Sequence, residues 1–102
     1  MPNSDLALKV CSKLLDIQNM HPTVTIFIFG SILTGRSYFS DIDILTVSKT
    51  EKIPFGLRHE IECLGEIHPI HLLIMSKREE EQFRFIELQG AISVGQLAQH
   101  SV

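Results

Sequence analysis

The stretch FGSILTGRSYFSDIDIL, residues 29–45, decides the fold of this chain. It begins at the end of the β-branched and aromatic run TVTIFIF (residues 23–29), which predicts a buried strand. It ends within DIDILTV (residues 41–47), which predicts a second strand. A Gly-Ser pair and then Asp-x-Asp follow the first strand. The polar residues that could bind a ligand or take part in a reaction therefore lie at the junction of the two predicted strands.

One interpretation of this junction is a phosphate-binding P-loop. Residues 30–37 have the spacing G-x-x-x-x-G-K-S, except that Arg36 replaces the lysine. A P-loop must run into a helix whose N-terminus holds the phosphates, and only three residues, 38–40, separate Ser37 from the next predicted strand. A helical crossover between parallel strands needs about a dozen residues, and a guanidinium does not simply replace the point charge of lysine. The spacing therefore disfavours a P-loop.

The other interpretation uses the Gly-Ser turn and the aspartates together. Gly30 removes a side chain where a phosphate must approach the backbone, and Ser31 offers a hydroxyl and an N–H at the start of a short turn. Asp41 and Asp43, two residues apart on a strand, point the same way with Cα atoms about 6.6 Å apart. Carboxylates at this spacing can converge on one Mg²⁺ or on a pair of ions. The alternative is that the two aspartates only form the polar edge of a strand.

The order of these features resembles the signature of the nucleotidyltransferase superfamily with the polymerase-β-like fold. That signature is a hydrophobic strand, Gly-Ser, a spacer and then Asp-h-Asp-h, where h is a hydrophobic residue. The chain is similar to the minimal nucleotidyltransferases of bacteria and archaea, many of which are encoded beside a helical HEPN partner. The resemblance extends from the first helix through ELQGAISV (residues 87–94). It implies an α/β (α+β) fold in which a small mixed sheet is flanked by helices, and a single nucleotidyltransferase-like domain over residues 1–102.

The resemblance also implies roles for particular residues. Gly30 and Ser31 would hold the β- and γ-phosphates of a nucleoside triphosphate, and Asp41 and Asp43 would ligate the catalytic Mg²⁺. Arg36 is a candidate phosphate contact, although a solvated surface arginine is an equal expectation for it.

The chain departs from the family pattern at the third carboxylate, which usually stands near the start of the next core strand. That strand is PIHLLIM (residues 69–75), and His71 stands at the carboxylate's place. Three functional interpretations follow: His71 is a neutral general base, Glu66 reaches the site because the strand begins early, or the site is impaired and only binds nucleotide or partner. The non-functional alternative is that His71 is a strand-edge histidine hydrogen-bonded to its neighbours. A His68–His71 metal pair is not expected, because residues three apart on a strand face opposite ways.

The rest of the pattern alternates between helices and strands, as an α/β arrangement requires. Apolar residues at helical spacing predict a first helix, ended by His21-Pro22, and a second that ends at Gly65. A capping-box pattern at Ser76–Glu79 predicts a third helix that runs to Gly90. We expect that helix to carry its apolar side chains inward and a short strand to follow it, and we expect the tail to fray or to pack on a partner. The inward side chains are Phe83, Ile86 and Leu88, and the short strand is Ala91–Val94.

Composition and charge limit the kinds of protein that this chain can be. The net charge is −3 and the basic residues are scattered, which does not suggest a general nucleic-acid binder. Cys11 and Cys63 are far apart and are expected to be buried free thiols in a reducing cytoplasm. The N-terminus lacks the pattern of a signal peptide, and no apolar run is long enough to span a bilayer. A cytoplasmic protein is expected.

The resemblance implies a Mg²⁺-dependent enzyme that transfers a nucleoside monophosphate, AMP first of all, from ATP or another NTP to an acceptor hydroxyl. A core of this size leaves little room for an acceptor site, so we expect a homodimer or a HEPN-type partner, which the protein would modify as an antitoxin. Two alternatives stay open. The chain is a catalytically impaired nucleotide- or partner-binding module of a two-component pair, or it is an α/β domain whose aspartates are structural.

Overall fold

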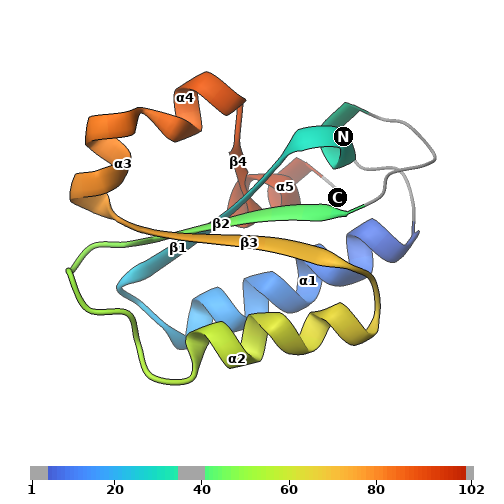
Figure 1. Ribbon diagram of the computed structural model, residues 1–102. Helices are drawn as coiled ribbons and strands as arrows, with labels where there is room; N and C mark the ends of the chain where they lie inside the picture. The colour runs from blue at the N-terminus through green and yellow to red at the C-terminus, as the bar shows by residue number, and fades with distance from the viewer. Residues whose placement is uncertain (1–4, 35–40, 101–102) are drawn as a thin grey trace.

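In the computed structural model, which describes residues 5–34 and 41–100, four strands form one mixed sheet with helices on both faces (Figure 1). The strands are β1 (Val24–Phe29), β2 (Ile42–Ser48), β3 (Ile70–Ser76) and β4 (Ile92–Ser93). The helices are α1 (Asp5–Met20), α2 (Leu57–Glu62), α3 (Lys77–Phe83), α4 (Phe85–Gln89) and α5 (Val94–His100), with short 3₁₀ helices η1 (Gly30–Thr34) and η2 (Cys63–Glu66). The predicted fold class, a small mixed sheet flanked by helices, is confirmed.

The strand order is β3-β2-β1-β4. β1 pairs antiparallel with both β2 and β4, whereas β2 and β3 run parallel. The C-terminal end of β1 and the N-terminal ends of β2 and β3 therefore meet at the same end of the sheet.

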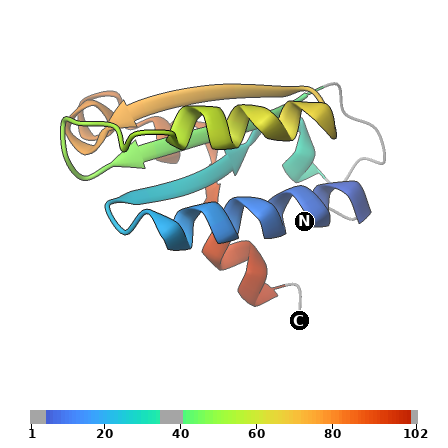
Figure 2. The same cartoon turned by 90° about the horizontal axis from the view of Figure 1, so that it is seen from below.

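One face of the sheet carries the larger apolar core. Figure 2 shows α1 and α2 side by side against this face, with α5 next to α1. Ile26 and Ile28 of β1 and Ile42 and Ile44 of β2 are fully buried beneath these helices. The long apolar stripe of α1, predicted from its helical spacing, thus has the sheet as its partner.

The opposite face carries a second apolar cluster beneath α3 and α4. Its buried members are Phe29, Leu45 and Val47, and Phe85 and Ile86 at the start of α4 pack against them. Because side chains alternate along a strand, Asp43 and His71 share this face with Leu45 and Leu73. In Figure 1, α3 and α4 lie over the half of this face where β2 and β3 end, away from η1.

The predicted third helix is wrong in one respect, because it is broken in two. Ser76 does form the predicted capping box with Glu79, but Arg84 adopts a left-handed conformation (φ 53°, ψ 40°) between α3 and α4. Neither Phe83 nor Leu88 faces inward as expected: Phe83, the last residue of α3, is 57% exposed, and Leu88, which follows the break, is 74% exposed. Only Ile86 of the three expected inward residues is half-buried.

The tail differs from the expectation as well. It neither frays over its whole length nor needs a partner to pack on, because residues 94–100 form α5. Val94 and Leu97, three residues apart on one helical face, are buried against the core that α1 covers. The short strand predicted at Ala91–Val94 is confirmed as the two-residue β4. No helix in residues 5–34 and 41–100 is long and apolar enough to cross a membrane.

The two cysteines differ in exposure, which corrects the expectation that both are buried. Both thiols are free, but Cys11 is buried in the core and Cys63 is exposed at the end of α2. Burial raises the pKa of the Cys11 thiol to about 11.

This difference predicts selective thiol chemistry. At pH 8 a colorimetric disulfide reagent should titrate Cys63 rapidly in the native protein and Cys11 only after unfolding in urea, because a buried thiol with a raised pKa is almost entirely protonated. The Cys63→Ser variant serves as the control and should show no rapid reaction. Rapid reaction of that variant would contradict the burial of Cys11.

Candidate active site

The site begins where β1 ends in a tight turn. Gly30 follows Phe29 with φ +83°, in the left-handed region that favours glycine, and opens the 3₁₀ helix η1. The short turn expected at Gly30 and Ser31 is thus a 3₁₀ helix. β2 then returns antiparallel to β1, which rules out the parallel crossover that a P-loop requires. Ser31 stands half-buried as the second residue of η1.

Asp43 lies at the centre of the junction. It pairs with Phe29 of β1 on one side and with His71 of β3 on the other. Its side chain is 24% exposed. A Cβ atom built on Gly30 would lie 2.2 Å from Asp43 Oδ2, a distance that real Cβ atoms essentially never show. Gly30 is therefore needed for a reason beyond phosphate approach: its missing side chain makes room for the Asp43 carboxylate.

His71 approaches the same carboxylate from the neighbouring strand. Its Nδ1 lies 3.3 Å from Asp43 Oδ1, and its side chain is 57% exposed. When Nδ1 carries the proton and donates it to the carboxylate, Nε2 keeps a lone pair. The parallel register of β2 and β3 produces this contact, since it places Asp43 and His71 directly side by side.

Of the other residues considered for the site, the structure describes Asp41 and Glu66. Asp41 is exposed and comes immediately before β2, where extended backbone would place it on the face of Asp43. Glu66 does not reach the strand by an early start, because it belongs to η2 and β3 begins only at Ile70. Arg36 lies outside the described residues.

The donor set at this end of the sheet is dominated by carboxylate oxygen. Asp41 and Asp43 offer the hard ligands that Mg²⁺ prefers, whereas the nitrogen of His71 suits softer ions better. Within residues 5–34 and 41–100, no three His, Cys, Asp or Glu side chains converge closely enough to hold a metal ion by themselves. The residues thus fit an ion that takes the rest of its oxygens from water and from a bound phosphate chain.

This arrangement agrees with the result of the family comparison. The family model described as "Nucleotidyltransferase domain" matches residues 10–94. The chain belongs to the nucleotidyltransferase domain family. Among curated proteins, none matches the chain. Membership explains the order of strand, Gly-Ser turn and Asp-x-Asp, and it assigns the chain to a family of nucleotidyl-transferring domains.

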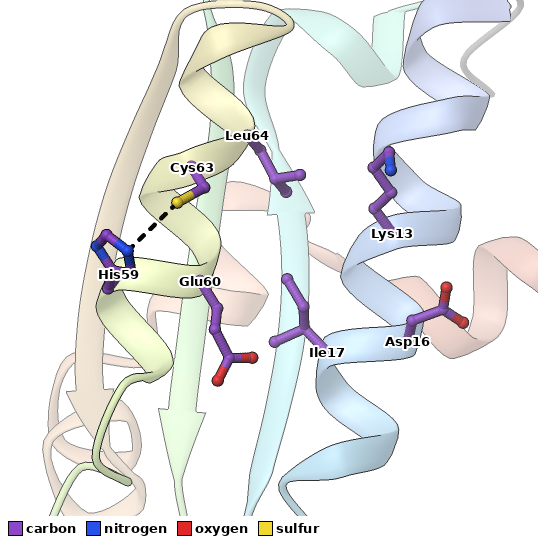
Figure 3. Close-up of a pocket in the computed structure, with 7 residues that line it drawn as sticks. All are labelled: Lys13, Asp16, Ile17, His59, Glu60, Cys63 and Leu64. Carbon is purple, nitrogen blue, oxygen red and sulfur yellow. Dashed lines mark hydrogen bonds between the residues drawn. The ribbon is translucent and has the colours of Figure 1, made fainter.

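A groove of about 430 Å³ lies between α1 and α2, and it was not anticipated from the sequence (Figure 3). It is lined by His59 of α2 and by Cys63 at the start of η2, whose Nε2 and Sγ atoms are 3.6 Å apart, and by Lys13 and Asp16 of α1. The sheet separates this groove from Asp43, because α1 and α2 cover the opposite face. The groove is therefore separate from the candidate site around Asp43.

Proposed function

We propose that this nucleotidyltransferase domain transfers a nucleoside monophosphate from an NTP to an acceptor hydroxyl, and that the transferred group is AMP. The observation that supports the proposal is the Asp43 carboxylate, held between the side-chain-free Gly30 and the His71 imidazole at the start of η1. A carboxylate fixed by two strands and open on one side is suited to a metal–nucleotide complex.

Asp41 and Asp43 would hold Mg²⁺, which would neutralise phosphate charge and stabilise the attacking and leaving oxygens. Gly30 would let the terminal phosphates approach the backbone, and Ser31 would donate to them from its hydroxyl and N–H. The hydroxyl of the acceptor then attacks the α-phosphorus, the bond to the β-phosphate oxygen breaks, and pyrophosphate leaves. The main role of the protein is to position these groups.

His71 would accept the proton that the attacking hydroxyl loses. The hydrogen bond from Nδ1 to Asp43 orients the ring and leaves Nε2 as the basic atom. The exposed imidazole is reachable by an acceptor that approaches over this face. In this proposal His71 takes over the proton-accepting part of the missing third carboxylate, and the metal-binding part is left to the aspartates.

Two radiolabelled substrates test the transfer. The protein is incubated with Mg²⁺, a lysate of the source organism and ATP labelled on the α- or on the γ-phosphate. Relative to the lysate alone, we expect the protein to add α-label to a macromolecule and to add no γ-label. A protein-dependent increase in transferred γ-label would indicate a kinase and contradict the proposal, as would no protein-dependent transfer of either label.

The acceptor is proposed to belong to another protein chain, either a second copy or a helical HEPN-type partner that the domain would modify as an antitoxin. The similarity to minimal nucleotidyltransferases supports this part of the proposal. Purified candidate partner, incubated with the domain and MgATP, should gain the mass of AMP on a side-chain hydroxyl.

The second candidate function is a catalytically impaired module that binds a nucleotide or a partner. The departure that favours it is the imidazole of His71 in the position where transferring relatives carry an acid. This candidate predicts tight partner binding that survives Asp41→Ala and Asp43→Ala, together with no label transfer. The enzyme instead predicts label transfer, together with Mg²⁺-dependent binding of NTP that needs both aspartates.

Substitution of His71 separates its roles. His71→Ala should lower the transfer rate by about 100-fold, the usual contribution of a positioned general base. His71→Asp should keep a larger share of the activity, because a carboxylate there restores the family pattern. MgATP affinity should change little in either variant. The matched control is His59→Ala, which removes an imidazole from the opposite side of the sheet. An unchanged rate in His71→Ala would remove this residue from the mechanism.

A further inference from the structure

The start of α4 packs an aromatic ring against Phe29, the last residue of β1. Arg84 adopts its left-handed conformation immediately before Phe85. The bend is held at several points: the Arg84 N–H donates to the Glu80 carbonyl, the Ile86 N–H donates to Glu80 Oε2 at 2.9 Å, and the Arg84 guanidinium pairs with Glu87. A non-glycine residue adopts this conformation only at a cost in free energy. The local contacts offset that cost and fix the direction of Phe85.

The ring of Phe85 rests on the residue that flanks Asp43. The centroids of Phe85 and Phe29 are 4.9 Å apart, and the rings meet edge to face at 85°. Phe29 is 7% exposed and pairs with Asp43 across β1 and β2. Phe85 is half-buried where it packs against the cluster of Phe29, Leu45 and Val47. An incompletely buried aromatic residue therefore lies one side chain away from the carboxylate, on the same face of the sheet.

We infer that Phe85 supports the nucleobase of the nucleotide whose phosphates lie at Gly30 and Asp43; this inference rests on the proposed function. A triphosphate bound at Gly30 and Asp43 must direct its ribose and base away from these residues. Phe85, at the start of α4, lies in one of the directions that the base could take. Every base offers a π-face to an aromatic ring, so the contact adds affinity without selecting one base through hydrogen bonds. Phe85 is thus a binding residue for the nucleoside part of the substrate.

Calorimetric titration with two probes tests the inference. MgATP carries the base, whereas magnesium tripolyphosphate carries only the phosphate chain. In Phe85→Leu we expect the affinity for MgATP to fall by about tenfold, within the range for base–aromatic stacking, and the affinity for tripolyphosphate to stay unchanged. Phe85→Tyr keeps the ring and should bind both probes as the wild type does.

The matched control is Phe83→Leu, the same substitution at an exposed ring on the other side of the Arg84 bend. It should leave both affinities unchanged, and urea unfolding of all variants should establish that they are folded. If Phe85→Leu bound MgATP as tightly as the wild type, or lost both probes equally, the inference would be overturned. If the wild type bound neither probe, the proposed function itself would fail.

Discussion

Gly30→Ala should abolish nucleotide binding while leaving a folded protein. The new methyl group would lie 2.2 Å from Asp43 Oδ2, so the carboxylate must leave its place between Gly30 and His71. The substitution also forces a side chain into φ +83°, which costs about 1–2 kcal/mol of stability. Calorimetric titration with MgATP should detect at least about a 100-fold loss of affinity, since a fixed electrostatic group is displaced.

Gly90→Ala separates the two effects of this change. Gly90 also has a positive φ, +64°, but a Cβ atom there would meet nothing within 4 Å. It should therefore lose similar stability in urea unfolding and bind MgATP normally. Equal binding losses in the two variants would show that backbone strain, and not the displacement of Asp43, disables the site.

Asp43→Asn should reduce nucleotidyl transfer by at least about 100-fold, because it removes the charge at the centre of the site while keeping the shape of the side chain. The loss should not come from unfolding. Asp43 is partly exposed, and its His71 contact can persist as a neutral hydrogen bond. The measurement is the rate of α-label transfer from ATP at saturating Mg²⁺.

The control for this prediction is Asp16→Asn, which makes the same chemical change on the exposed side of α1, in the groove shown in Figure 3. Its transfer rate should match the wild type. Full activity of Asp43→Asn would exclude this carboxylate from the chemistry, whatever the control showed.

Much of the site could be anticipated from sequence because it depends on short-range rules. The run before Gly30 is too β-branched and aromatic for anything but a strand, and Asp-x-Asp opens the next one. Two strands with a short connection pair readily, and their pairing brings Gly30 to Asp43. The position of His71 followed from the same reasoning, since its strand is the next one along the chain.

The features that sequence reasoning missed depend on tertiary contacts. The break at Arg84 places an arginine in a conformation that glycine or asparagine usually adopts, and the pairing of Glu80 with Ile86 that holds it involves residues six apart. Because the break was missed, the contact of Phe85 with Phe29 was missed too. Phe83 precedes the break and was assigned to the wrong face of its helix. Cys63 was expected to be buried because it lies on an amphipathic helix, but it falls beside the apolar stripe and not within it.

The room that Gly30 makes for Asp43 was also missed. Each residue alone suggested a function, phosphate approach for one and metal binding for the other. Only the antiparallel register, with Phe29 opposite Asp43, shows that the two are coupled sterically.

The most direct test of the nucleotidyltransferase site is a calorimetric titration of ATP into the wild-type protein, with Mg²⁺ and then with EDTA, beside the Asp41→Ala/Asp43→Ala double variant. We predict saturable binding that needs Mg²⁺ and that the double variant loses. Binding that persists in EDTA, or that the double variant retains, would contradict a metal–nucleotide site built on these two aspartates.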